Sequence, residues 1–145
     1  MSEGQGSYQV RFDWGAAGAA AVGRDADAIV WVSQVLQTPG PADAIPGSLE
    51  RAAELAEWSL AQQHRLGGRF RVAVVAAGAA RADGSLRFAV EDLLASGAII
   101  DAIAEVGIDH QSPEAAAAAS AYRGLRGATR HLISAAVSSR ESTSD

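Results

Sequence analysis

The chain has no cysteine among its 145 residues. Disulfide bonds, thiolate nucleophiles and cysteine-ligated zinc or iron–sulfur centres are therefore excluded. It also has no lysine, because all 12 basic residues are arginine, and they stand against 17 acidic residues for a net charge of −5. A strongly basic surface of the kind that binds nucleic acid is not expected from this balance.

No apolar run approaches the roughly 20 residues that a membrane-spanning helix needs. The first ten residues, MSEGQGSYQV, lack the basic and then apolar pattern of a signal peptide. We therefore expect a soluble, cytoplasmic protein without a membrane partner. The chain also lacks the GxGxxG, P-loop and GxSxG motifs, and its three histidines are too far apart to form a metal site.

The residues that are present predict one compact domain of strands and helices. Apolar and polar residues alternate over 8–14, which predicts a half-exposed strand with Arg11 on its polar side. Continuous apolar runs within 27–35 and 71–78 predict strands that are covered on both faces. Patterns typical of helices occupy the remaining segments, 15–22, 48–64, 86–106 and 112–137.

Local signals mark one of these helices clearly. Ser112 is a good N-cap, Pro113 suits the first helical position, and Glu114 favours the positive end of a helix. The alternation of strands and helices predicts an α/β fold, a layered α/β/α domain with a small, mainly parallel sheet. It would span residues 8–137, between a loose tail at 1–7 and a disordered polar tail at 138–145. Three predicted strands make a small sheet, so we expect either an exposed sheet edge or one that a second copy of the chain covers, as in a homo-oligomer.

Two adjacent acids, Glu91 and Asp92, lie in the otherwise largely apolar stretch DGSLRFAVEDLLASG. Ionised acids are rarely buried without a partner. Successive helical residues point about 100° apart, so apolar neighbours flank Asp92 on its own face. A divalent cation such as Mg²⁺ would supply the missing positive charge. The alternative is structural: an Arg87–Glu91 ion pair, with Asp92 bonded to the backbone or to an arginine.

Two glycine turns follow predicted strands. Backbone amides near Gly15 and Gly18 are candidates for holding a phosphate, and a nucleotide site there is one hypothesis. A tight turn with close packing is the alternative. The turn at Gly78 follows the clearest strand, at the position where α/β proteins usually bind their ligands.

Several of these segments together resemble the 2-phosphosulfolactate phosphatase family. The similar stretches are RVAVVAAG, DGSLRFAVEDLLASGAIIDAI and SPEAAAAASAY, with YQVRFDWGAAGA and SLERAAELAEWSLAQQ before them. The resemblance implies an α/β fold and a phosphoric monoester hydrolase that uses Mg²⁺ to cleave 2-phosphosulfolactate or a similar small phosphorylated acid. It also implies that Glu91 and Asp92 are the acidic residues of the site, for catalysis and for the metal.

The same resemblance implies that Gly78 ends the strand beside these acids and that Gly97 permits close packing. Contact of Arg87 with a phosphate or sulfonate is our inference from its charge. The chain departs from the family pattern after its second strand, where Ser33–Gln37 contains no acid and the family's long middle region is absent. The alternative is thus a non-catalytic family remnant that acts as an interaction or oligomerisation module.

Overall fold

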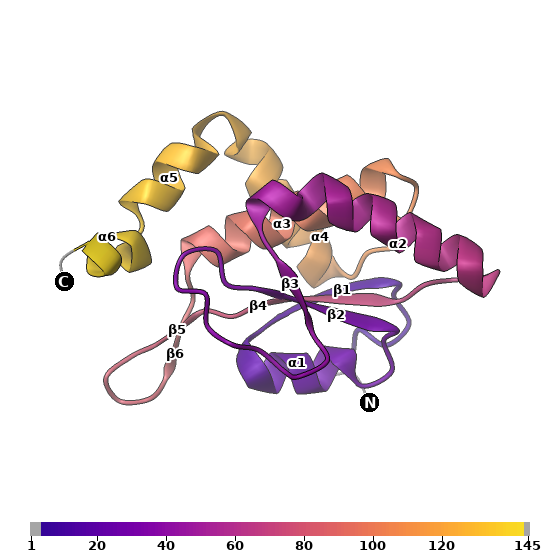
Figure 1. Cartoon of the computed structure of the whole chain (residues 1–145), viewed down its shortest axis with the longest axis horizontal. Helices are drawn as coiled ribbons and strands as arrows, with labels where there is room; N and C mark the ends of the chain where they lie inside the picture. The colour runs from indigo at the N-terminus through magenta and orange to yellow at the C-terminus, as the bar shows by residue number, and fades with distance from the viewer. Residues whose placement is uncertain (1–3, 144–145) are drawn as a thin grey trace.

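The structure, a computed structural model, describes residues 4–143 and consists of a parallel sheet between layers of helices (Figure 1). Four parallel strands lie in the order β1-β4-β2-β3: β1 (Val10–Trp14), β2 (Ala28–Val32), β3 (Ile45–Gly47) and β4 (Val72–Ala76). The predicted α/β fold with a mainly parallel sheet is confirmed. The prediction of three strands is wrong, because β3 has the sequence Ile-Pro-Gly, which is too short to show a strand pattern.

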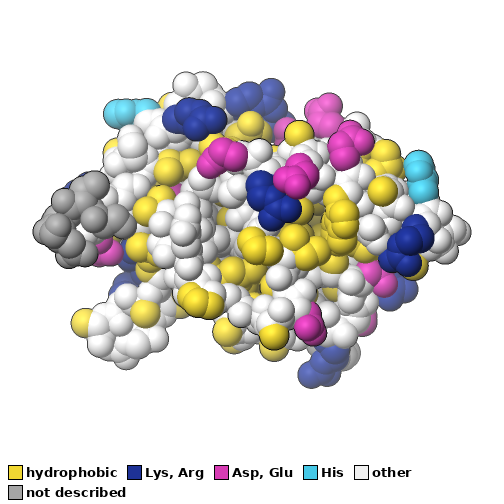
Figure 2. Space-filling view, viewed as in Figure 1, with side chains coloured by type: hydrophobic (Ala, Val, Ile, Leu, Met, Phe, Trp, Pro, Cys, Tyr) yellow, Lys and Arg dark blue, Asp and Glu magenta, His cyan; other side chains and the backbone are white. Residues whose placement is uncertain are grey.

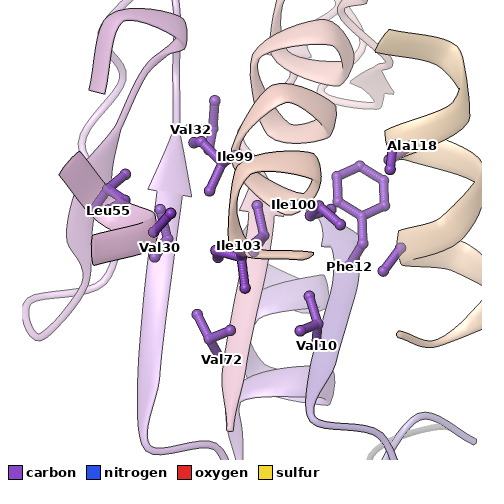
Figure 3. Packing of buried hydrophobic residues seen from close by; sticks show 14 of the residues in the cluster. Val10, Phe12, Val30, Val32, Leu55, Val72, Ile99, Ile100, Ile103 and Ala118 are labelled. Carbon is purple, nitrogen blue, oxygen red and sulfur yellow. The ribbon is translucent and has the colours of Figure 1, made fainter. Parts of the chain in front are cut away.

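Helices cover both faces of the sheet unequally. One face carries α1 (Gly15–Gly23), whose Ala19 and Val22 pack with Ala73 and Val75 of β4. The other face carries α2 (Ala52–Leu66), α3 (Val90–Glu105) and α4 (Pro113–Gly124). In this larger core, Leu55 of α2 and Ala118 of α4 lie on either side of the α3 residues Ile99, Ile100 and Ile103 (Figure 3). The predicted cap is present, since the Ser112 hydroxyl accepts the Ala115 amide at 3.0 Å.

The free edge of β1 is closed by the chain itself. The Gln5 side chain is buried, donates to the Phe12 carbonyl at 2.9 Å and accepts the Phe12 amide at 3.0 Å. Val10 donates to His110 and accepts from Ser112. Residues 4–7 are therefore part of the fold rather than the predicted loose tail, whose residues 1–3 lie outside the described chain. With its backbone groups satisfied, β1 offers little to a strand from a second copy.

Arg11 corrects the prediction of a half-exposed first strand, because its side chain is fully buried. Its guanidinium donates to the backbone carbonyls of Tyr8, Gly6 and Val22, and it forms an ion pair with Asp25. A buried arginine is tolerated when its donors are satisfied. The alternation pattern detects a polar residue but not these partners.

The C-terminal region also differs from the prediction. In place of one long helix and a disordered tail, the chain forms η2 (Arg126–Ala128), α5 (Thr129–Ala135) and α6 (Val137–Thr143) after α4. Ser138 is completely buried, and residues 144–145 of the predicted tail lie outside the described chain. Within residues 4–143, no helix combines the length and apolar character needed to cross a bilayer.

Close contact between α3 and α4 requires a glycine at position 97, as the sequence indicated. A β-carbon there would overlap the Ala118 carbonyl oxygen and lie 2.9 Å from the Tyr122 β-carbon. The neighbouring atom is backbone on a second helix, so the helices themselves would have to separate.

We therefore predict that Gly97→Ala lowers the free energy of unfolding by about 1–3 kcal/mol or more, the usual cost of overpacking a core. Gly124→Ala is the matched control, since a β-carbon at Gly124 meets nothing within 4 Å. It should be neutral or stabilise the protein by up to about 1 kcal/mol. Urea denaturation of both variants measures the difference, and equal stability of the two would contradict the packing assignment.

Candidate functional site at the carboxyl edge of the sheet

The two predicted acids lie where neighbouring strands β2 and β4 end. Asp92 is in the first turn of α3, and its carboxylate spans the gap between the two strand ends. Oδ1 accepts the backbone amide of Gln34 at 2.8 Å, and Oδ2 accepts that of Gly78 at 2.9 Å. The structure thus brings Gly78 and Asp92 together, and one side chain joins three elements of the fold.

Gly78 is shaped for this contact. Its φ of +69° is one that residues with side chains rarely adopt, and a β-carbon there would lie 2.6 Å from Leu86 Cδ1. Leu86 belongs to a small hairpin, β5 (Ala79–Ala80) and β6 (Leu86–Arg87), that projects from the body (Figure 1). The turn therefore holds the Gly78 amide toward Asp92 while the hairpin folds over it.

Burial dominates the electrostatics of Asp92, whose residue is 2% exposed. Loss of hydration raises the pKa of Asp92 from 3.8 to about 7, against the opposing effect of the amide from Gln34. The charge of Glu91 adds to the rise, while the amide of Gly78 and the charge of Arg87 oppose it. Asp92 therefore titrates near neutral pH despite two good hydrogen bonds.

Glu91 is as deeply buried as Asp92 but lacks its partners. The residue is 1% exposed, and Oε1 is buried without a hydrogen-bond partner in residues 4–143. Because it is one residue from Asp92 on α3, its side chain leaves the helix about 100° away. A buried carboxylate oxygen without a donor is a costly feature that a cation, a water molecule or a proton would relieve.

Arg87 contacts the C-terminal helix. Its Nη2 donates to the Ser138 hydroxyl at 3.0 Å and lies 3.6 Å from a carboxylate oxygen of Glu141. The Arg87–Glu91 pair considered from the sequence is not among the ion pairs of the described chain. The other half of that alternative is present, since Asp92 is bonded to the backbone. Ser138 was missed because the tail around it has the composition of a disordered segment.

The donor set limits the kind of metal that this site suits. Residues 4–143 contain no group of three or more His, Asp or Glu side chains placed to hold a metal ion. Mg²⁺, however, is often held by one or two carboxylates, with water and substrate phosphate completing its shell. The unpaired Oε1 of Glu91 fits such a ligand, and each Asp92 oxygen keeps a lone pair beyond the amide that it accepts. The two residues of the acid pair, Glu91 and Asp92, thus each offer oxygens of the kind that magnesium binds, although their side chains leave α3 about 100° apart.

The turn at Gly15 and Gly18 is filled by protein atoms. A β-carbon at Gly15 would meet Leu86 at 3.6 Å, and one at Gly18 would lie 2.9 Å from the Asp13 side chain. Asp13 also accepts the Trp14 amide at 2.7 Å. These contacts favour the tight-turn interpretation over a nucleotide site.

A cleft that reaches Gln34, the residue bonded to Asp92, was not predicted. It has a volume of about 510 Å³ and lies at the carboxyl ends of β2 and β3, over the loop that contains three of the four prolines. Its lining includes Ser33, Gln34, Ser48 and Arg51. We call it the carboxyl-edge cleft. Loop composition alone gave no signal for it, because the cavity arises from the way 33–47 folds across the sheet edge.

Gln34 links this cleft to the acid pair. Its backbone amide binds Asp92, while its side chain accepts the Leu49 amide at 2.8 Å and donates to the Glu50 carboxylate at 2.9 Å. Leu49 and Glu50 belong to η1 (Leu49–Arg51), which leads into α2. A ligand in the cleft would therefore contact a residue that is directly bonded to Asp92.

The raised pKa of Asp92 predicts how stability varies with pH. The folded state holds a proton on Asp92 between about pH 4 and 7, where the unfolded chain has lost it. The free energy of unfolding should therefore fall as pH rises through this window, by up to about 4 kcal/mol. Asp92→Asn, which has no proton to lose, should remove this decrease. Urea denaturation in EDTA from pH 4 to 8 measures it.

Asp109→Asn is the matched control for this experiment, since Asp109 is an exposed carboxylate. It should retain the wild-type variation with pH. A wild-type slope in Asp92→Asn would show that the assigned titration is incorrect.

Comparison with known proteins adds no assignment. No family model matches the chain, and a search of curated proteins gives no match. The grounds for assigning a function are therefore the residues and geometry of the acid pair and the carboxyl-edge cleft, together with the resemblance of the sequence.

Proposed function

We propose that this chain hydrolyses the phosphate ester of a small acidic molecule, 2-phosphosulfolactate or a similar compound, in a Mg²⁺-dependent reaction. The observation that carries the proposal is the unpaired, buried Oε1 of Glu91 next to Asp92 at the carboxyl ends of β2 and β4. Strand ends of this kind are where open α/β sheets bind ligands. A carboxyl group with a raised pKa, as Asp92 has, near a cleft is a recurrent feature of active sites.

Each residue of the proposed site would have a separate role. Glu91 Oε1 and an oxygen of Asp92 would hold Mg²⁺, which when bound neutralises phosphate charge and favours attack by water. Asp92 also positions the backbone of Gln34 and Gly78. The carboxyl-edge cleft would take the substrate. Arg51 is the cation in its lining, and because it is paired with Glu54 and bonded to the Pro46 carbonyl it would contact the substrate only on leaving a partner. Arg87 would contact the phosphate only after leaving Ser138, so we assign it no role in the closed structure.

A second candidate function is a non-catalytic module that associates with another copy of itself. The acid pair is 1% and 2% exposed, and both oxygens of Asp92 already accept backbone amides. This arrangement also suits a purely structural role. Large apolar side chains are exposed nearby: Phe88 is 67% exposed while it stacks on Trp14, and Leu86 and Val90 on either side of it are also exposed. Because the edge of β1 is closed, such association would use side chains or the other edge strand, β3.

Phosphate release from 2-phosphosulfolactate and other small phosphorylated acids tests the first proposal. We expect release that requires Mg²⁺ and stops with EDTA. Glu91→Gln should lower kcat by about 100-fold or more, because it removes a charge that holds the metal. Glu57→Gln, at an exposed glutamate of α2, is the control and should retain activity. The proposal also requires Mg²⁺ to raise the Tm of the wild type and not that of Glu91→Gln. Absence of Mg²⁺-dependent phosphate release, or of the rise in Tm, would eliminate it.

Light scattering after size exclusion tests the second candidate. Phe88→Ser should convert an oligomer into a monomer, since it removes the most exposed aromatic side chain of the hairpin region. Leu66→Ser changes an exposed apolar residue at the end of α2 and should leave the oligomer intact. A wild-type chain that is monomeric at all concentrations would rule this candidate out.

A further inference from the structure

A second cavity lies apart from the acid pair, where α4 turns through η2 into α5. Its volume is about 390 Å³. Its lining combines basic, aromatic and small residues: Leu49, Tyr122, Arg126, Gly127, Ala128, Thr129, Arg130 and His131. We call it the arginine cavity. Dark blue and cyan side chains gather over this upper end of the molecule in Figure 2, where α5 lies in Figure 1.

This region is basic in an otherwise acidic protein. Residues 120–140 contain four arginines and one histidine but no aspartate or glutamate, while the whole chain has a net charge of −5. Asp101 on α3 is bonded to two of these arginines, to Arg123 at 2.8 Å and to Arg126 at 3.2 Å. One carboxylate therefore balances two guanidinium groups, which leaves an excess of positive charge beside the cavity.

Two basic side chains of the lining, those of Arg130 and His131, have no hydrogen-bond or ion-pair partner in residues 4–143. Arg126, by contrast, is held in place, because its guanidinium lies 5.5 Å from the centre of the Tyr122 ring and is bonded to Asp101. A fixed arginine beside a free one favours a ligand with several acceptor oxygens.

We propose that the arginine cavity binds the phosphate group of a small organic phosphate. Arg126 and Arg130 would donate to its oxygens, and His131 would add a third donor. Tyr122 and Leu49 provide an apolar wall for the organic part. The volume is within the range of sites for small molecules, about 300–1,000 Å³. This site is distinct from the proposed catalytic one and does not depend on it.

Calorimetric titration with inorganic phosphate and with phenyl phosphate, at matched ionic strength, tests the proposal. We expect saturable binding of both, with phenyl phosphate the tighter because of its contact with Tyr122. Arg130→Gln should weaken binding at least about tenfold, since it removes a charge-assisted hydrogen bond. Arg65→Gln is the control, because that exposed arginine contacts Gln62 on α2, away from the cavity. It should keep the wild-type Kd.

Circular dichroism of Arg130→Gln should show the wild-type fold, which separates lost binding from lost folding. Titration in EDTA, which removes the Mg²⁺ that the catalytic proposal requires, should give the same binding of both phosphates, so this site and the catalytic proposal can fail independently. Absence of saturable binding in these titrations would overturn the proposal. Binding that Arg130→Gln and Arg126→Gln leave unchanged would overturn it equally.

Discussion

The carboxylate of Asp92 is the interaction on which the rest of the functional edge depends. Through two backbone amides it connects the ends of β2 and β4 to the first turn of α3. Gln34, fixed in this way, reaches the start of α2 with its side chain. Gly78, fixed on the other side, begins the hairpin that carries Leu86 and Arg87. Removal of this one side chain would release the supports of both the cleft and the hairpin.

Two neighbouring acids in the same helix turn, Glu91 and Asp92, differ in whether their carboxylate oxygens have hydrogen-bond donors. Both are excluded from water, yet Asp92 has a donor for each oxygen while Glu91 Oε1 has none in the described chain. A satisfied buried carboxylate is explained by structure alone, whereas an unsatisfied one needs a further partner. The catalytic and the structural interpretations of the acid pair therefore differ most at Glu91.

Arginine, the only strongly basic side chain in this protein, acts as a connector at several places. Arg11 binds three backbone carbonyls from inside the core, and Arg87 attaches α6 to the hairpin. Arg126 lies against Tyr122 and is bonded to Asp101. A planar guanidinium with five donors can satisfy several acceptors at once, which an ammonium group does less well. The same property underlies the proposed recognition of phosphate in the arginine cavity.

The sequence by itself determined the features that depend on short-range order. Continuous apolar runs specified β2 and β4, and the Ser112 cap specified the start of α4. The tertiary structure alone decided the environment of Arg11, the helix α6 and the partners of Asp92. Gln34 is 58 residues from Asp92 in the chain, and Gln5 is seven from Phe12, so no periodic pattern relates them. Hydrophobic periodicity records which face of an element is buried, but the partner of a buried polar group is set only when distant segments meet.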